Sequence, residues 1–168
     1  VKAFQDSFKR HVSFFHGCYV NYNYPHRGKD LISVMNALGY GVHMLENEKC
    51  CGTALISNCM IDQAKKNAVN NVESIRKSVY ERQMPVIGTS SSCNFTIRDE
   101  YPHLLGIDNS DVRDYIELAT RFIYRLIEED KVKLVFKKGY KAKVAYHTPC
   151  HMERLGWGIF STELIKMI

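Results

Sequence analysis

Two adjacent cysteines followed by glycine, Cys50-Cys51-Gly52, carry the most chemical information in this chain. Adjacent thiols are poor disulfide partners for each other because the backbone between them would be strained. They also do not easily reach the same face of a single metal ion, whereas they can bind two different irons of one cluster. The pair therefore points first to iron–sulfur chemistry.

The cysteines follow short apolar runs that are typical of β-strands. The predicted strands are Val12–Phe15, Val42–Leu45, Val86–Thr89 and Val144–Tyr146. Apolar residues at helical spacing predict helices between them, through Leu31–Leu38, Ile61–Val79 and Val112–Leu126. Strands that alternate with helices favour an α/β fold, with a mostly parallel sheet and flanking helices in a Rossmann-like three-layer arrangement.

This order of elements predicts where the thiols meet. In open α/β sheets the loops after the strands share one edge and form the binding crevice. Metal and cofactor binding is therefore predicted for the cysteines after the strands, with the last one nearby or at a neighbouring position: Cys18, Cys50, Cys51, Cys93 and Cys150. The competing interpretation is that these cysteines are small buried hydrophobic residues.

Other candidate residues have weaker claims. Cys59 lies at the start of a predicted helix and is expected to be structural. His16, His147 and His151 flank the cysteines. The sequence favours neither a ligand role nor a hydrogen-bonding role for them. The basic segment Lys137–Lys141 is expected to be an exposed connection.

Composition narrows the class of protein. The 168 residues are 45% apolar and 24% charged, which suits a globular domain. The net charge of +5 comes from scattered lysines and arginines, which does not favour nucleic-acid binding. The sequence shows neither a transmembrane stretch nor a signal-peptide pattern. Six cysteines in such a chain indicate a reducing compartment, expected to be the cytoplasm.

A pattern near the start of the chain recurs near its end. The strand–His–Cys arrangement of Val12–Cys18 is repeated, with one residue of slippage, at Val144–Cys150. Residues 1–143 are therefore expected to form one cysteine-rich module, and residues 144–168 the truncated start of a second. We expect the chain to be a fragment of a longer protein with two modules.

The succession Gly17-Cys18, Cys50-Cys51-Gly52 and Ser92-Cys93 resembles the cysteine-rich CCG domain of heterodisulfide reductases and their relatives. Within that family, several stretches look most like the C subunits of anaerobic glycerol-3-phosphate dehydrogenases. These stretches are His16–Asn23, Arg98–Pro102, Arg113–Arg125 and Tyr146–Glu153. The likeness runs from about residue 12 to the end of the chain.

The resemblance implies a subunit of an oxidoreductase complex that carries electrons and holds no catalytic residue. In that family a flavin-bearing catalytic subunit oxidises sn-glycerol 3-phosphate during anaerobic respiration. Electrons then pass through iron–sulfur clusters, [4Fe–4S] being the favoured type here, to membrane quinone. The implied partners are the flavin subunit and an anchor subunit, and the implied location is peripheral, on the cytoplasmic face of the inner membrane.

One position departs from the family pattern. Thr96 stands where the full motif has a second cysteine, three residues after Cys93. The full motif supplies five thiolates to a non-cubane cluster, whereas four suffice for an ordinary [4Fe–4S] or [2Fe–2S] cluster. Two alternatives stay open. One is a docking domain with zinc-bound or free thiols, and the other is a redox module in which Cys50 or Cys51 pairs with Cys18 or Cys93.

Overall fold

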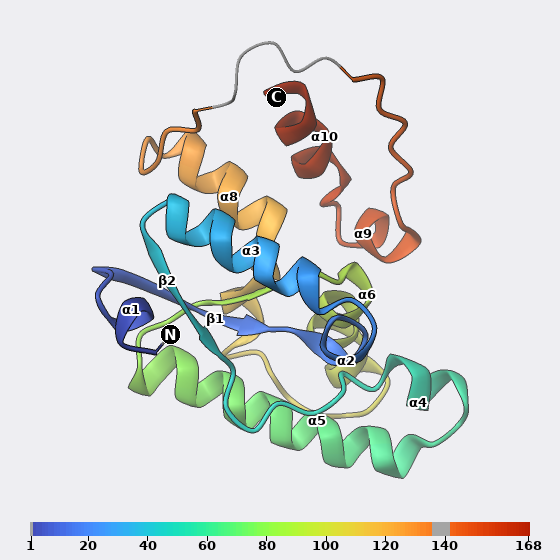
Figure 1. The fold of residues 1–168 in the computed structure, drawn as a ribbon. Coiled ribbons are helices and arrows are strands. Elements are labelled where there is room, and N and C mark those ends of the chain that lie inside the picture. Colours follow the sequence, from blue (N-terminus) through green and yellow to red (C-terminus); the bar gives the residue numbers. More distant parts are fainter. Residues whose placement is uncertain (1, 136–141) are drawn as a thin grey trace.

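The computed structural model describes residues 2–135 and 142–168, which form a parallel sheet with helices on both faces (Figure 1). The strands are β1 (Arg10–Phe15), β2 (Tyr40–Met44), β3 (Val86–Gly88) and β4 (Ile116–Leu118). The helices are α1 (Lys2–Asp6), α2 (Gly17–Tyr22), α3 (Pro25–Ala37), α4 (Thr53–Ser57), α5 (Ile61–Arg76), α6 (Ser91–Phe95), α7 (Tyr101–His103), α8 (Ala119–Glu128), α9 (Cys150–Arg154) and α10 (Gly158–Lys166). Two π-helical turns, Lys77–Glu81 and Thr96–Glu100, extend α5 and α6, and a 3-10 turn, Arg113–Tyr115, precedes β4.

The strands lie in the order β2-β1-β3-β4, and every neighbouring pair is parallel. Side chains alternate along β1, so that Phe14 and Phe15 enter cores on opposite faces of the sheet. Met35 of α3 packs in the core with Phe14, whereas Ile75 of α5 packs in the core with Phe15. The α/β prediction with three layers is confirmed.

Three predicted strands and the long central helix are confirmed. The strands β1, β2 and β3 overlap the predicted runs, and α5 with its π-helical turn covers the predicted helix Ile61–Val79. The core-facing positions of α5 recur at Ala64, Ala68, Val72 and Ile75, as helical periodicity requires. The helix predicted from Leu31 begins earlier, at Pro25, a residue suited to the first helical turn.

The fourth strand was predicted in the wrong place. Val112–Leu126 has helical spacing throughout, yet residues Ile116–Leu118 form β4 and only α8 after them is helical. The exposed edge of β3 explains the difference, because unpaired backbone groups there are satisfied by pairing with β4. The predicted strand Val144–Tyr146 is instead an exposed segment without regular secondary structure, outside the sheet.

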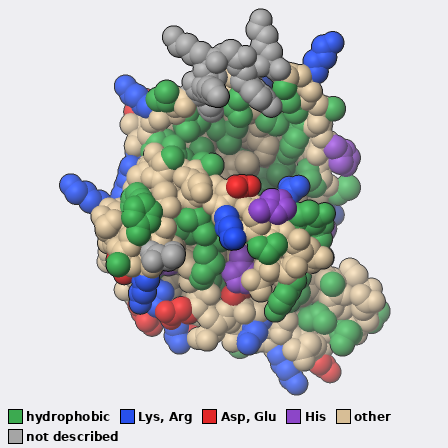
Figure 2. Space-filling view, in the orientation of Figure 1, with side chains coloured by type: hydrophobic (Ala, Val, Ile, Leu, Met, Phe, Trp, Pro, Cys, Tyr) green, Lys and Arg blue, Asp and Glu red, His purple; other side chains and the backbone are tan. Residues whose placement is uncertain are grey.

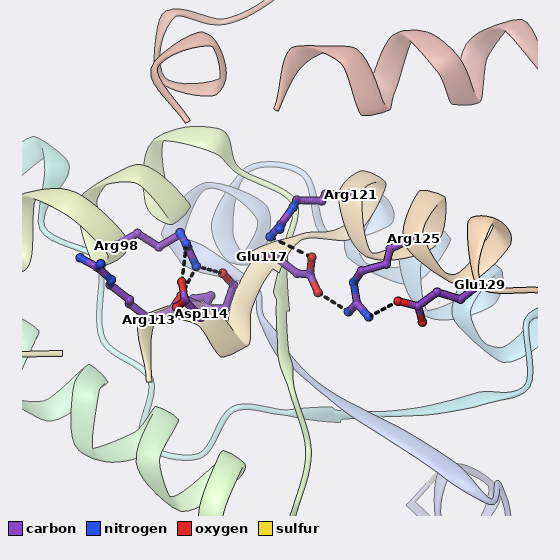
Figure 3. A network of polar contacts seen from close by, with 8 residues as sticks. Arg98, Arg113, Asp114, Glu117, Arg121, Arg125 and Glu129 are labelled. Atoms are coloured by element: carbon purple, nitrogen blue, oxygen red, sulfur yellow. Dashed lines mark hydrogen bonds and ion pairs between the residues drawn. The ribbon is translucent and has the colours of Figure 1, made fainter. Parts of the chain in front are cut away.

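Charged side chains hold β4 to α8 (Figure 3). Glu117, whose side chain is 6% exposed, accepts contacts from Arg121 at 3.2 Å and Arg125 at 2.6 Å. Arg98 donates to the carbonyl of Ile116 at 3.0 Å and pairs with Asp114 at 2.8 Å. A buried carboxylate is costly unless it is paired, so the two arginines allow Glu117 to lie in the sheet.

The C-terminal helices pack against the first part of the chain. Trp157, buried before α10, contacts the guanidinium groups of Arg98 and Arg121, which lie 5.0 Å and 4.7 Å from its ring centroid. The Ser161 hydroxyl donates to Thr120 at 3.1 Å. Whether residues 144–168 begin a second module remains a prediction.

Replacing Trp157 with alanine should loosen α9 and α10 while the sheet stays intact, because both arginine contacts and the buried ring are lost. We expect amide hydrogen exchange of residues 150–166 to become roughly tenfold faster, equivalent to about 1.4 kcal/mol. Ile159→Ala, at an exposed position of α10, is the control. Unchanged protection in α9 would contradict this packing role.

Among the described residues on the face drawn in Figure 2, lysines and arginines are scattered around hydrophobic side chains and form no concentrated basic patch. Among the described residues, no helix combines the length and apolar character needed to cross a bilayer. The predicted connection Lys137–Lys141 lies outside the described residues.

Candidate metal centre

Three strand ends deliver the predicted thiols to one edge of the sheet. Cys18 lies in the first turn of α2, directly after β1. Cys50 and Cys51 follow β2 and precede α4, and Cys93 lies in α6, after β3. The strands are parallel, so their carboxyl ends share this edge.

The four side chains meet. The Sγ atoms of Cys18 and Cys50 are 3.8 Å apart. Cys51 interacts with the side chains of both Cys50 and Cys93. Cys93 Sγ also lies 3.3 Å from the point that a Cβ atom would occupy at Gly17. The structure thus brings together Cys18, Cys50, Cys51 and Cys93.

Two glycines make this approach possible. Gly17 has a φ of +70° and leaves room for the Cys93 sulfur, so a side chain there would be strained and would crowd the thiol. Gly52 has a φ of +97° and turns the chain from Cys51 into α4. The backbone conformation therefore explains why glycine stands before Cys18 and after Cys51.

The thiols differ in acidity. Burial, followed by the neighbouring Cys50, raises the pKa of Cys18. The hydrogen bond with Cys51, together with burial, raises the pKa of Cys50. The hydrogen bond with Cys50 lowers the pKa of Cys51, but Cys93 and burial outweigh it and raise that pKa to about 12. The hydrogen bond with Cys51 lowers the pKa of Cys93 despite burial. Metal binding at these thiols must therefore release protons.

Buried polar side chains hold the Cys50-Cys51 turn in place. Asn71 is fully buried, and its amide donates to the Lys49 carbonyl at 3.1 Å while its oxygen accepts from the Lys49 N–H at 2.8 Å. Asn71 also donates to the Tyr101 hydroxyl at 3.0 Å, and Tyr101 donates to the Cys51 carbonyl at 2.9 Å. These protein contacts therefore position the turn.

Glu48 connects this turn to the Cys18 segment. Its side chain is 4% exposed and accepts hydrogen bonds from the backbone N–H groups of His16 at 3.0 Å and Gly17 at 2.7 Å. His16 Nδ1 lies 3.3 Å from the same carboxylate. Burial raises the pKa of Glu48 to about 7, although His16 and the two N–H groups act in the opposite direction.

This raised pKa predicts a pH dependence of stability in the metal-free protein. The folded state keeps the Glu48 proton up to about pH 7, whereas the unfolded chain releases it near 4.5. The resulting stabilisation is present below pH 4.5 and is lost as the pH rises through 7, by about 3 kcal/mol. Urea unfolding across this range should show the loss in wild type and not in Glu48→Gln. The exposed Glu81→Gln should behave as wild type, and an identical slope in Glu48→Gln would contradict the assignment.

The remaining candidates lie elsewhere or have protein partners. Cys150 is exposed at the start of α9, and the adjacent His151 contacts the Ser92 hydroxyl at 2.9 Å and stacks on Phe95. Cys59 is exposed between α4 and α5. His147 is exposed as well. His16 and His151 thus act as hydrogen-bonding residues in this structure.

The donor set suits an iron–sulfur cluster, because thiolates are the ligands such clusters take. Four ligands at about 2.3 Å from a tetrahedral metal lie about 3.8 Å apart. The separation of Cys18 Sγ and Cys50 Sγ equals that edge, so these two thiols are close enough to share one metal; thiolates that bind different irons of a cluster lie farther apart. Across residues 2–135 and 142–168, no three metal-binding side chains already form a single-ion site. The site is thus a group of neighbouring thiols rather than a closed mononuclear cage.

Sequence reasoning missed Glu48, Asn71 and Tyr101. A signal existed for Asn71, because an amide among the core-facing residues of a helix needs buried partners. Glu48 had no comparable signal, since its partners are backbone groups distant in sequence.

The fold and the thiol group define the class of protein. The model of the cysteine-rich CCG domain family matches residues 12–98, slightly more than half of the chain. The chain belongs to this family.

Curated relatives agree with this assignment. The C subunit of anaerobic glycerol-3-phosphate dehydrogenase from Escherichia coli is 53% identical over 168 residues, which are 100% of this chain and 42% of that protein. Lactate utilization protein A of Shouchella clausii is 31% identical over 86% of this chain and 59% of its own length. An uncharacterized iron-sulfur protein of Methanocaldococcus jannaschii is 30% identical over 97% of this chain and 30% of its own length. The chain spans less than two thirds of each relative, and no solved structure matches it.

Proposed function

We propose that this chain is the cluster-holding part of an iron–sulfur electron-transfer subunit. Four thiols gathered at one sheet edge carry this proposal. Cys18, Cys50, Cys51 and Cys93 would hold the cluster, with [4Fe–4S] the favoured type for four ligands. Such a cluster accepts and releases single electrons.

The protein residues have distinct roles in this function. Cys51 and Cys93 are buried, whereas Cys18 is exposed. One side of the site is thus shielded by the core and the other faces the surface, where a partner can exchange electrons. The contacts of Asn71, Tyr101 and Glu48 hold the thiol segments ready, which lowers the ordering cost of binding. Cys150 is a candidate neighbouring ligand because α9 packs on α6.

The relationship to the C subunit suggests the surrounding pathway. We propose that electrons come from a flavin-bearing subunit that oxidises sn-glycerol 3-phosphate. They would pass through this subunit toward membrane quinone in anaerobic respiration. An anchor subunit would hold the complex at the cytoplasmic face of the inner membrane. This subunit would then carry electrons and perform no bond chemistry on substrate.

A docking domain with zinc-bound or free thiols is the second candidate, favoured by Thr96 at the position of the fifth family cysteine. Anaerobic reconstitution of the full-length protein with iron and sulfide separates the two. If a cluster forms at this site, wild type should contain iron and sulfide, show charge-transfer absorbance and give an EPR signal on reduction. Cys51→Ser should lose all of these. Zinc uptake without iron would support the docking domain.

A further inference from the structure

A chain of side-chain hydrogen bonds leads from Cys51 away from the thiols. Cys51 Sγ lies 3.3 Å from the Thr53 hydroxyl oxygen, which lies 2.7 Å from the Thr96 hydroxyl oxygen. Thr96 in turn donates to the Glu100 carboxylate. Thr96 is fully buried, whereas Glu100 is half-buried at the outer end. The buried threonine at the family's fifth cysteine position is therefore connected to a predicted ligand.

The number of available protons fixes which group donates in each of these hydrogen bonds. An ionised carboxylate only accepts, so the single Thr96 proton goes to Glu100. The Thr96 oxygen must then receive the Thr53 proton. Thr53 has no proton left for Cys51, and its oxygen faces the sulfur with a lone pair. The ionised Glu100 thus directs both hydroxyl protons away from the thiol group.

We propose that Glu100 is a positioning residue that acts through Thr96 and Thr53 to withhold a hydrogen bond from the Cys51 sulfur, keeping the reduction potential of the bound cluster low. The inference rests on the proposed function. Hydrogen bonds to cysteine sulfur stabilise the charge that a cluster gains on reduction, and such bonds tune its potential. The arrangement favours electron donation from this site over electron storage.

Glu100→Gln should reverse the chain. Unlike the carboxylate, glutamine can present its N–H2 group to the Thr96 oxygen; in that orientation the Thr96 proton turns to Thr53 and the Thr53 proton turns to Cys51. Removing the negative charge also raises the potential by itself, and a double variant separates the two effects. Glu100→Gln with Thr53→Val keeps the charge change and removes the hydroxyl that would donate to the Cys51 sulfur.

The first test is an EPR-monitored redox titration of the full-length reconstituted protein. Glu100→Gln should shift the ratio of reduced to oxidised cluster about tenfold at a fixed potential, which is about 59 mV for one electron. The double variant should lose most of that shift. Glu163→Gln, which removes a half-buried carboxylate paired with Lys166, should match wild type. An equal shift in the single and double variants would overturn the proposal that Glu100 acts through Thr96 and Thr53, a hydrogen-bond relay.

A second measurement works without a cluster. The S–H stretch of Cys51 in the metal-free protein is assigned by its loss in Cys51→Ser. In wild type both the Thr53 oxygen and Cys93 can accept from this S–H group, and the hydrogen bond to Thr53 lowers its infrared frequency. Glu100→Gln should raise the frequency, and Glu163→Gln should not. If no cluster forms, the proposed function fails while this band still decides the relay. An unmoved band in Glu100→Gln would refute the relay alone.

Discussion

Replacing Cys51 with serine should abolish the cluster that reconstitution forms at this site. A hard alcohol oxygen is a poor substitute for a soft thiolate, and Cys51 contacts both Cys50 and Cys93 at the centre of the thiol group. Site-specific iron and sulfide content should fall to background, with loss of the EPR signal. Cys50→Ser should have the same effect. Circular dichroism checks that each variant is folded.

Cys59→Ser is the matched control, because Cys59 is exposed between α4 and α5, and its cluster content should equal that of wild type. In the proposed dehydrogenase complex, Cys51→Ser should block quinone reduction. Oxidation of glycerol 3-phosphate with an artificial acceptor at the proposed flavin subunit should continue. Quinone reduction that survives Cys50→Ser would instead identify a docking domain.

Replacing Asn71 with alanine should cause the second large effect. The change leaves the Lys49 N–H and carbonyl groups without their buried partner, and it removes the donor to the Tyr101 hydroxyl. Each unsatisfied buried group costs about 1–3 kcal/mol, so we expect a loss of about 3 kcal/mol in the free energy of unfolding. For a domain of this size the melting temperature should fall by about 10 °C.

Urea unfolding of the metal-free protein measures this loss. Gln63→Ala, at an exposed position of the same helix, should change the unfolding free energy by less than about 0.5 kcal/mol. The affinity for iron should also fall in Asn71→Ala, because the Cys50-Cys51 turn is no longer held in place. Wild-type stability in Asn71→Ala would show that the turn does not depend on this amide.

The sequence by itself determined the parallel sheet and the meeting of four thiols. Alternating strands and helices leave few topologies, and the loops after parallel strands must share one edge. The positions of Cys18, Cys50 and Cys93 directly after three such strands therefore sufficed to place them together.

Only the tertiary structure decided the fourth strand and the contacts that support the thiols. Ile116–Leu118 has helical spacing, and pairing with the open edge of β3 overrides it. Glu48 and Thr96 likewise have partners that are remote in sequence. Whether Thr96 donates or accepts also depends on which groups surround it. Local patterns report which face of an element is apolar. They do not report which distant backbone or hydroxyl group a polar side chain will meet, because that depends on how the elements pack.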